Sequence, residues 1–128
     1  MGCPSITVWG TGTARREFLY SDDLADAAVF LMNLPEPAFQ AACRLDPPLL
    51  NVGCGEDLTI RELVDFVMET VGYRGEVVYD RTKPDGTPRK LLDVSRMRRL
   101  GWSARVPLRE GLARFYRAFL EEHTHGHA

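Results

Sequence analysis

The sequence predicts an α/β fold, in which about four short strands alternate with amphipathic helices. Short runs of apolar residues have the length of strands at 6–9, 49–52 and 77–79. Apolar residues recur with helical spacing over 21–32, 60–71 and 108–119. Because so few strands make a thin sheet, we expect these 128 residues to be part of a longer polypeptide.

The composition is that of a soluble globular protein, with 45% hydrophobic and 27% charged residues. Sixteen basic and eighteen acidic residues leave a net charge of −2, so electrostatics give no reason to expect nucleic acid or an anionic membrane as a partner. No apolar run reaches the roughly 18–20 residues that a membrane span requires. Met1–Pro4 do not begin a signal peptide.

The cysteines and histidines favour neither a metal site nor a catalytic set. Cys3, Cys43 and Cys54 are too few and too scattered for a disulfide framework or a zinc site, which favours a reducing, cytoplasmic setting. All three histidines lie in residues 123–128, far from any cysteine or serine that they could activate. We interpret residues 123–128 as a disordered, histidine-containing tail and residues 1–122 as one domain.

The first third of the chain predicts a strand, a second extended run and a helix. Gly10–Thr13 is a turn after the first strand, and residues 17–20 form the second extended run. Ser21 is placed to cap a helix that ends near Met32, with two acidic residues in its first turn. Its apolar residues at helical spacing are Leu24, Ala27, Ala28 and Leu31. Prolines between 35 and 48 predict an exposed loop.

The middle of the chain predicts a strand followed by a well-capped helix. The apolar run 49–52 ends in Gly53-Cys54-Gly55, which we interpret as a tight connection rather than a phosphate loop, because the third glycine of the dinucleotide fingerprint is missing. Residues 59–62, with the sequence Thr-Ile-Arg-Glu, form a capping box. The helix should bury Leu63, Phe66 and Val67 and end at Gly72.

The last third predicts one strand, a long loop and two helices. The strand covers 77–79, and prolines with a glycine make 81–89 a loop. Ser95 is expected to cap a short helix that stops at Gly101. Pro107 is a suitable first residue for the final helix. The residues that this helix is expected to bury are Leu108, Leu112, Phe115, Tyr116 and Phe119.

Two stretches carry side chains suited to a nucleotide. In residues 9–16, Trp9 offers a flat apolar face, and Arg16 offers a guanidinium fork for phosphate. In residues 83–90, a rigid loop presents Asp85, for a polar edge or a ribose diol, and Lys90, for phosphate. The alternatives are a buried strand tryptophan beside a solvated basic pair, and a polar loop whose charges face water. The Asp22-Asp23 pair is best explained as first-turn helix residues.

Longer motifs resemble those of a known family. Residues 16–27 and 51–63 resemble the extended short-chain dehydrogenase/reductases that act on sugar nucleotides, which include epimerases, dehydratases and reductases. Residues 8–16 and 83–95, with Leu-Gly-Trp at 100–102, are more specific and resemble GDP-L-fucose synthases. The resemblance covers roughly residues 6 to 122. Ala14 and Pro107 depart from the family's usual residues, outside the proposed site.

The resemblance implies a small C-terminal substrate-binding α/β domain without its Rossmann domain. Family enzymes make GDP-L-fucose from GDP-4-keto-6-deoxy-mannose by two epimerisations and an NADPH-dependent reduction. Carried onto this sequence, Trp9, Arg16 and Lys90 would contact the GDP-sugar, with Asp85 a fourth contact. The family's NADPH fingerprint and its catalytic residues would lie upstream of Met1. We therefore expect no cofactor site and no catalytic residue on this chain.

Two rival interpretations remain open at this point. The chain can belong to another nucleotide-sugar enzyme, one that takes a UDP- or dTDP-sugar. It can also be a non-catalytic remnant that folds and self-associates, because a face such as that of Leu63, Phe66 and Val67 would be exposed without the rest of the enzyme. We expect a homo-oligomer on the same ground.

Overall fold

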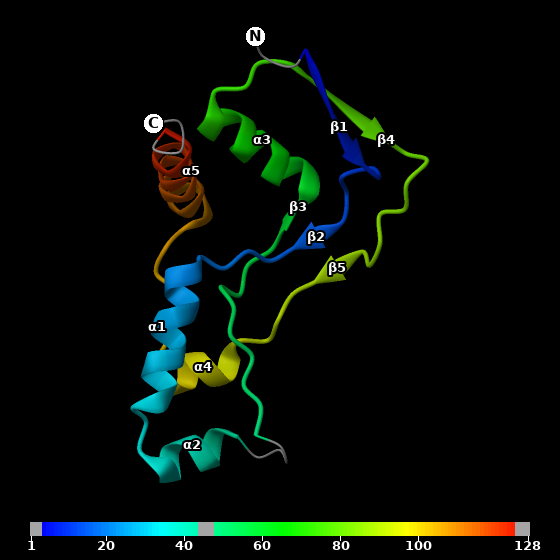
Figure 1. Cartoon of the computed structure of the whole chain (residues 1–128). Coiled ribbons are helices and arrows are strands. Elements are labelled where there is room, and N and C mark those ends of the chain that lie inside the picture. Colours follow the sequence, from blue (N-terminus) through cyan, green and yellow to red (C-terminus); the bar gives the residue numbers. More distant parts are fainter. Residues whose placement is uncertain (1–3, 44–47, 125–128) are drawn as a thin grey trace. The chain divides into compact units, whose positions relative to one another are not determined.

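A computed structural model describes residues 4–43 and 48–124 of the chain (Figure 1). These residues form two compact units. The first unit contains residues up to 16, residues 58–90 and residues from 108 onward. The second unit contains 17–57, apart from the gap, and 91–107. Among the described residues, no helix is both long and apolar enough to span a membrane.

The first unit contains two small sheets, which confirms the predicted α/β class. Strand β1 (Ser5–Trp9) pairs in parallel with β4 (Glu76–Asp80), and Trp9 lies opposite Asp80. In the second sheet β2 (Arg15–Arg16) is central. Its neighbours are β3 (Leu58–Thr59), which is antiparallel, and β5 (Arg89–Lys90), which is parallel. The strands predicted at 6–9 and 77–79 are confirmed.

Helix α3 (Ile60–Val71) has the ends that local sequence predicts. The Glu62 amide donates to Thr59 Oγ1 at 3.1 Å, and the Thr59 amide donates to Glu62 Oε2 at 2.7 Å. This capping box satisfies donors that the first helical turn leaves unpaired. Gly72 ends the helix with φ of 72°, in the left-handed region that favours glycine. Both helix boundaries predicted from the sequence are confirmed.

Helix α5 (Leu108–Thr124) lies beside α3 and begins directly after Pro107 (Figure 1). Leu112 and Tyr116 are half-buried, but Phe115 is 68% exposed and Phe119 is 45% exposed. The prediction that this helix buries both phenylalanines is therefore wrong, because α3 covers only part of its circumference. The helix continues to Thr124 and so includes His123, whereas His125 and His127 lie outside the described residues.

The inner face predicted for α3 is only partly buried. Leu63 and Phe66 are half-buried, and Val67 is exposed. The Arg109 guanidinium of α5 lies over the Phe66 ring, with its carbon 4.0 Å from the ring centroid. An amphipathic arginine can cover apolar surface in this way while its charge stays in water.

The second unit is helical, and its described residues contain no strand. Its helices are α1 (Ser21–Met32), α2 (Glu36–Ala42) and α4 (Ser95–Leu100). Ala27, Met97 and Trp102 form its buried centre. Leu50 and Val52 pack against this centre, so the predicted strand at 49–52 is wrong. Leu49 is 61% exposed, so only part of the run is covered, and the described residues of the unit offer no strand for it to pair with.

Several local predictions need correction. Strand β2 ends at Arg16, so residues 17–20 are not a strand. Tyr20 and Val94, not Ser21 and Ser95, precede the first helical turns of α1 and α4. The proline-rich segment contains helix α2, because Pro37 falls in its first turn, where a missing N–H costs nothing. Leu24 is 53% exposed.

Asp23 has a structural role beyond the first helical turn. Its side chain is only 5% exposed. Its Oδ2 accepts hydrogen bonds from the amides of Arg105 at 3.0 Å and Val106 at 2.9 Å. The carboxylate therefore ties the start of α1 to the segment after α4, which supports the structural interpretation of this acidic pair.

Replacement of Asp23 should destabilise the second unit. Asp23→Ala leaves two backbone amides without their charged acceptor, so we expect a loss of about 1–3 kcal/mol of unfolding free energy. Asp22→Ala is the matched control, because Asp22 is exposed, and it should change stability by about 0.5 kcal/mol or less. Urea denaturation measures both. Equal midpoints for the two variants would contradict this role.

Candidate functional site

The strongest functional feature is a pair of cations on neighbouring strands. In the parallel pairing of β2 with β5, Arg16 lies opposite Lys90. Side chains at paired positions project from the same face of a sheet, so these two cations are neighbours. The guanidinium of Arg16 donates to the Arg15 carbonyl at 2.7 Å. Among the described residues, neither Arg16 nor Lys90 forms an ion pair with a carboxylate.

Backbone contacts hold this pair in place. The Arg15 amide donates to the Pro88 carbonyl at 2.8 Å, which brings the end of the 81–88 loop to the strand. The Ile60 amide donates to the Ala14 carbonyl at 3.0 Å, at the start of α3. Two like charges placed side by side repel each other, so an anion bound between them would stabilise the arrangement. A diphosphate, with several negatively charged oxygens, fits that requirement.

Trp9 presents an open aromatic face at the end of β1. Its side chain is 72% exposed, so the alternative of a buried strand tryptophan is wrong. The ammonium nitrogen of Lys83 lies 5.4 Å from the ring centroid, within the range of a cation–π contact. Lys83 was not singled out from the sequence as a site residue. Its approach to Trp9 depends on how the 81–88 loop folds back.

Asp85 is engaged by the turn that follows Trp9. Its Oδ1 accepts from the Thr11 amide at 2.6 Å, and its Oδ2 accepts from the Thr11 hydroxyl at 2.7 Å. Gly10 has φ of 83°, and a Cβ there would lie 2.3 Å from Asp85 Oδ1. Glycine at position 10 is therefore required both by the turn and by the close approach of the carboxylate.

Arg61 holds the same turn from the other side. Its amide donates to the Gly12 carbonyl at 2.9 Å, and its guanidinium donates to the Thr11 carbonyl at 3.0 Å. The guanidinium carbon also lies 4.1 Å from the centroid of the Tyr79 ring. From the sequence, Arg61 was visible only as a member of the capping box. No local signal predicts a contact with a turn so distant in the chain.

The four predicted site residues thus fall into two groups. Arg16 and Lys90 are adjacent in one sheet. Trp9 ends a strand of the other sheet, and Asp85 binds the turn directly after it. All four belong to the first unit. The turn and the 81–88 loop are the segments that connect the two groups.

Hydrogen bonds from Thr11 hold the pKa of Asp85 below its usual range. The hydrogen bond from the Thr11 backbone amide lowers this pKa most, and the hydrogen bond from the Thr11 hydroxyl lowers it next. Hydrogen bonds to the charged form of a carboxylate favour that form. The Asp85 side chain is therefore a carboxylate at neutral pH, and it remains one at pH values that protonate an ordinary aspartate.

The Gly53-Cys54-Gly55 connection does not fit a pyrophosphate. The Glu17 carboxylate already occupies it: the Gly55 amide donates to Glu17 Oε2 at 2.6 Å, and a Cβ at Gly53 would meet the same carboxylate. Burial raises the pKa of the Cys54 thiol, and the charge of Glu17 raises it further, which disfavours the thiolate. These residues therefore support neither a dinucleotide phosphate site nor a reactive thiol.

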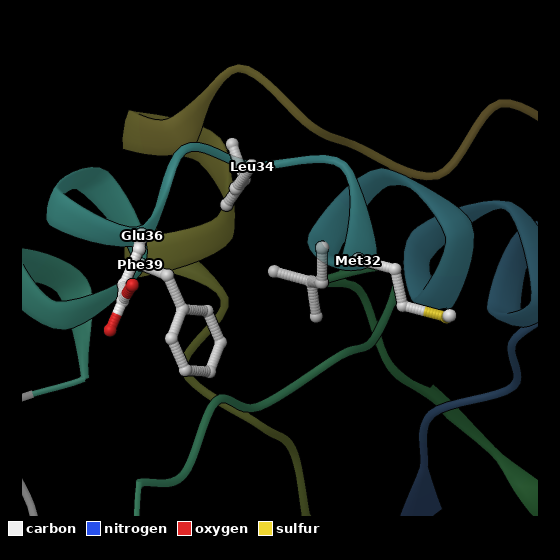
Figure 2. A pocket seen from close by; sticks show the side chains of 5 residues that line it. Met32, Leu34, Glu36 and Phe39 are labelled. Atoms are coloured by element: carbon white, nitrogen blue, oxygen red, sulfur yellow. The ribbon is translucent and has the colours of Figure 1, made fainter.

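The cavities of the second unit offer a different chemistry. One, of about 340 Å³, is lined mainly by apolar residues, with Met32 and Phe39 on opposite sides (Figure 2). Another, of about 590 Å³, lies between α2 and α4 and is lined by alanines, Leu100, Arg96 and Arg99. No group of three histidine, cysteine or acidic residues among the described residues can hold a metal ion.

Comparison with known proteins identifies relatives over most of the chain. The profile of the NAD dependent epimerase/dehydratase family matches residues 2–43. The GDP-L-fucose synthase of Escherichia coli (strain K12) is 48% identical over 92% of this chain and 37% of its own length. Two solved structures from Campylobacter jejuni are similar. A GDP-6-OMe-4-keto-L-xylo-heptose reductase is 35% identical over 92% of this chain and 34% of its own, with a TM-score of 0.82. The GDP-mannoheptose C4 reductase MlghC, with NADP bound, is 34% identical over 91% and 35%, with a TM-score of 0.77.

The chain is similar to proteins of the NAD-dependent epimerase/dehydratase family, and its α/β structure matches a C-terminal part of their fold. Within that family, its sequence matches the C-terminal part of GDP-L-fucose synthases, so the resemblance stated from the motifs is confirmed. The chain spans about a third of the length of the relatives it matches.

The Asp85 carboxyl provides a pH test of the local geometry. Because its folded pKa is lowered, the bonds to Thr11 should persist as pH falls below the unfolded value and disappear only as pH passes the folded pKa. We expect a carbon-13 NMR titration to give a lower midpoint in the folded chain than in the urea-unfolded chain. Identical midpoints in the two states would mean that Asp85 does not bind Thr11 in solution.

Proposed function

We propose that this chain supplies the GDP-sugar-binding part of a GDP-L-fucose synthase. The observation that carries the proposal is the pair Arg16 and Lys90, held in register on β2 and β5 without a carboxylate partner among the described residues. This pair is suited to the diphosphate of a nucleotide sugar. The name of the Escherichia coli relative supports GDP as the nucleotide.

The other predicted residues fit the same ligand. Trp9, exposed at the end of β1, offers a flat face for the base or the sugar, and Lys83 adds a third cation near that face. Asp85 anchors the 81–88 loop to the turn after Trp9 by accepting a hydrogen bond from the Thr11 hydroxyl. Here the chain's own residues bind and orient the ligand. They are not assigned a proton or hydride transfer.

The complete enzyme would use NADPH, which supplies the hydride for the reduction when it is bound. On this chain the Glu17 carboxylate occupies the Gly53-Cys54-Gly55 connection, so this connection does not fit the phosphates of the cofactor. We propose that the complete enzyme makes GDP-L-fucose in the cytoplasm, and that the residues described here contribute substrate binding alone.

Calorimetric titration tests the role of the cation pair. We expect the purified chain to bind GDP in preference to UDP. Arg16→Ala and Lys90→Ala should each weaken GDP binding roughly tenfold or more, because each removes a charge-assisted contact to phosphate. Higher salt should weaken binding to the wild type more than binding to either variant.

Arg99→Ala is the matched control for this titration. Arg99 is an exposed arginine of the second unit that lines the cavity between α2 and α4, so its removal should leave GDP affinity unchanged. A loss of affinity in Arg99→Ala, with none in Arg16→Ala, would assign the nucleotide to that other cavity. Preference for UDP over GDP would favour the other nucleotide-sugar enzymes.

A second candidate role is self-association. The exposed side chains of Phe115 and Phe119 lie one helical turn apart on α5, and Val67 and Val71 of α3 are also exposed. Exposed apolar surface of this kind drives association when nothing else covers it. We propose that the chain forms a homo-oligomer through this surface.

Light scattering of the chain at high concentration tests this association. We expect a mass above that of a monomer, and Phe115→Ser should shift the chain toward monomer. Ala118→Ser, at another exposed position of the same helix, should leave the mass unchanged. A monomeric wild type would rule the proposal out.

A further inference from the structure

Asp85 faces the turn after β1 with both of its carboxylate oxygens. Oδ1 accepts from the Thr11 amide and Oδ2 from the Thr11 hydroxyl, at 2.6 and 2.7 Å. When the two oxygens of a carboxylate each accept a hydrogen bond from the same residue, the carboxylate is held in a fixed orientation. Each oxygen of the carboxylate that was predicted to touch the ligand therefore already accepts a hydrogen bond from the turn.

The same contact fixes the residues on either side of it. Trp9 immediately precedes the Gly10–Thr13 turn, and Lys83 lies in the loop that Asp85 anchors. At the far end of that loop, Pro88 accepts the amide hydrogen bond of Arg15, just before β5. The loop is thus pinned at two points, one toward Trp9 and one toward the strand that carries Lys90.

We infer that Asp85 is a positioning residue that acts through Thr11, and that Arg61 supports it by holding the opposite side of the turn. The Thr11–Asp85 contact sets where Trp9 and Lys83 stand relative to the cation pair. This inference rests on the proposed nucleotide-sugar binding. It changes the role of Asp85 from a ligand contact to a residue that preorganises other contacts.

A double-mutant cycle separates positioning from direct contact. Thr11→Val removes the hydroxyl donor but keeps the amide, the size of the side chain and the Asp85 carboxylate. We expect Thr11→Val to weaken GDP binding about fivefold, and Asp85→Ala about tenfold. The double variant should bind as Asp85→Ala does, because the hydroxyl acts only through the carboxylate.

Thr13→Val is the matched control. Thr11 Oγ1 also lies 2.8 Å from Thr13 Oγ1, so Thr11→Val breaks that contact as well. If positioning by Asp85 is what matters, Thr13→Val should bind GDP as the wild type does. Wild-type affinity in Thr11→Val, with a loss in Asp85→Ala, would overturn the inference and make Asp85 a direct ligand. Equal losses in Thr11→Val and Thr13→Val would overturn it too.

Hydrogen exchange gives a readout that needs no ligand. The Thr11 amide donates to Asp85, so its exchange should be at least tenfold faster in Asp85→Ala than in the wild type, and Asp85→Asn should fall between them. Unchanged exchange in Asp85→Ala would overturn the inference. Failure of the wild type to bind GDP would count against the proposed function alone, since the exchange experiment still tests the contact.

Discussion

The parallel pairing of β2 with β5 is the constraint on which the proposed site depends. It places Arg16 opposite Lys90, although like charges at paired positions repel each other. Each strand has only two residues, so the pairing depends on the neighbouring segments that hold the strands in position. These are the Gly10–Thr13 turn, the 81–88 loop and the start of α3. The hydrogen bonds of Asp85 and Arg61 converge on that turn. An anionic ligand would then relieve the repulsion that the protein tolerates.

The two units differ in the roles of their charged side chains. The first unit carries all four predicted ligand residues on short strands and loops, and its helix α3 contributes Arg61. The second unit encloses an apolar centre around Met97 and uses carboxylates as internal acceptors: Asp23 binds two amides after α4, and Glu17 binds the Gly55 amide. Both carboxylates therefore have a structural role as hydrogen-bond acceptors inside the unit.

Features that depend on neighbouring residues were predictable from the sequence, and features that depend on tertiary partners were not. The capping box at Thr59 and the glycine stop at position 72 are local, and both were predicted correctly. The apolar run 49–52 has strand composition, but a strand also needs a partner, and Leu50 and Val52 pack instead against the apolar centre of the second unit. The helical spacing of Phe115 identifies an apolar face without saying what covers it. The contacts of Lys83 with Trp9 and of Arg61 with Thr11 were not predictable from the sequence, because only the folded chain brings these residues together.

The central claim is that the Arg16–Lys90 pair receives the diphosphate. The most direct measurement is an NMR titration of the labelled chain that follows the Arg16 side-chain Nε–H and the Lys90 amide as GDP, and then guanosine, is added. The account predicts that GDP shifts both signals saturably, while guanosine, which lacks phosphate, leaves them in place. Saturable shifts confined to Arg96 and Arg99, with none at Arg16 or Lys90, would contradict it.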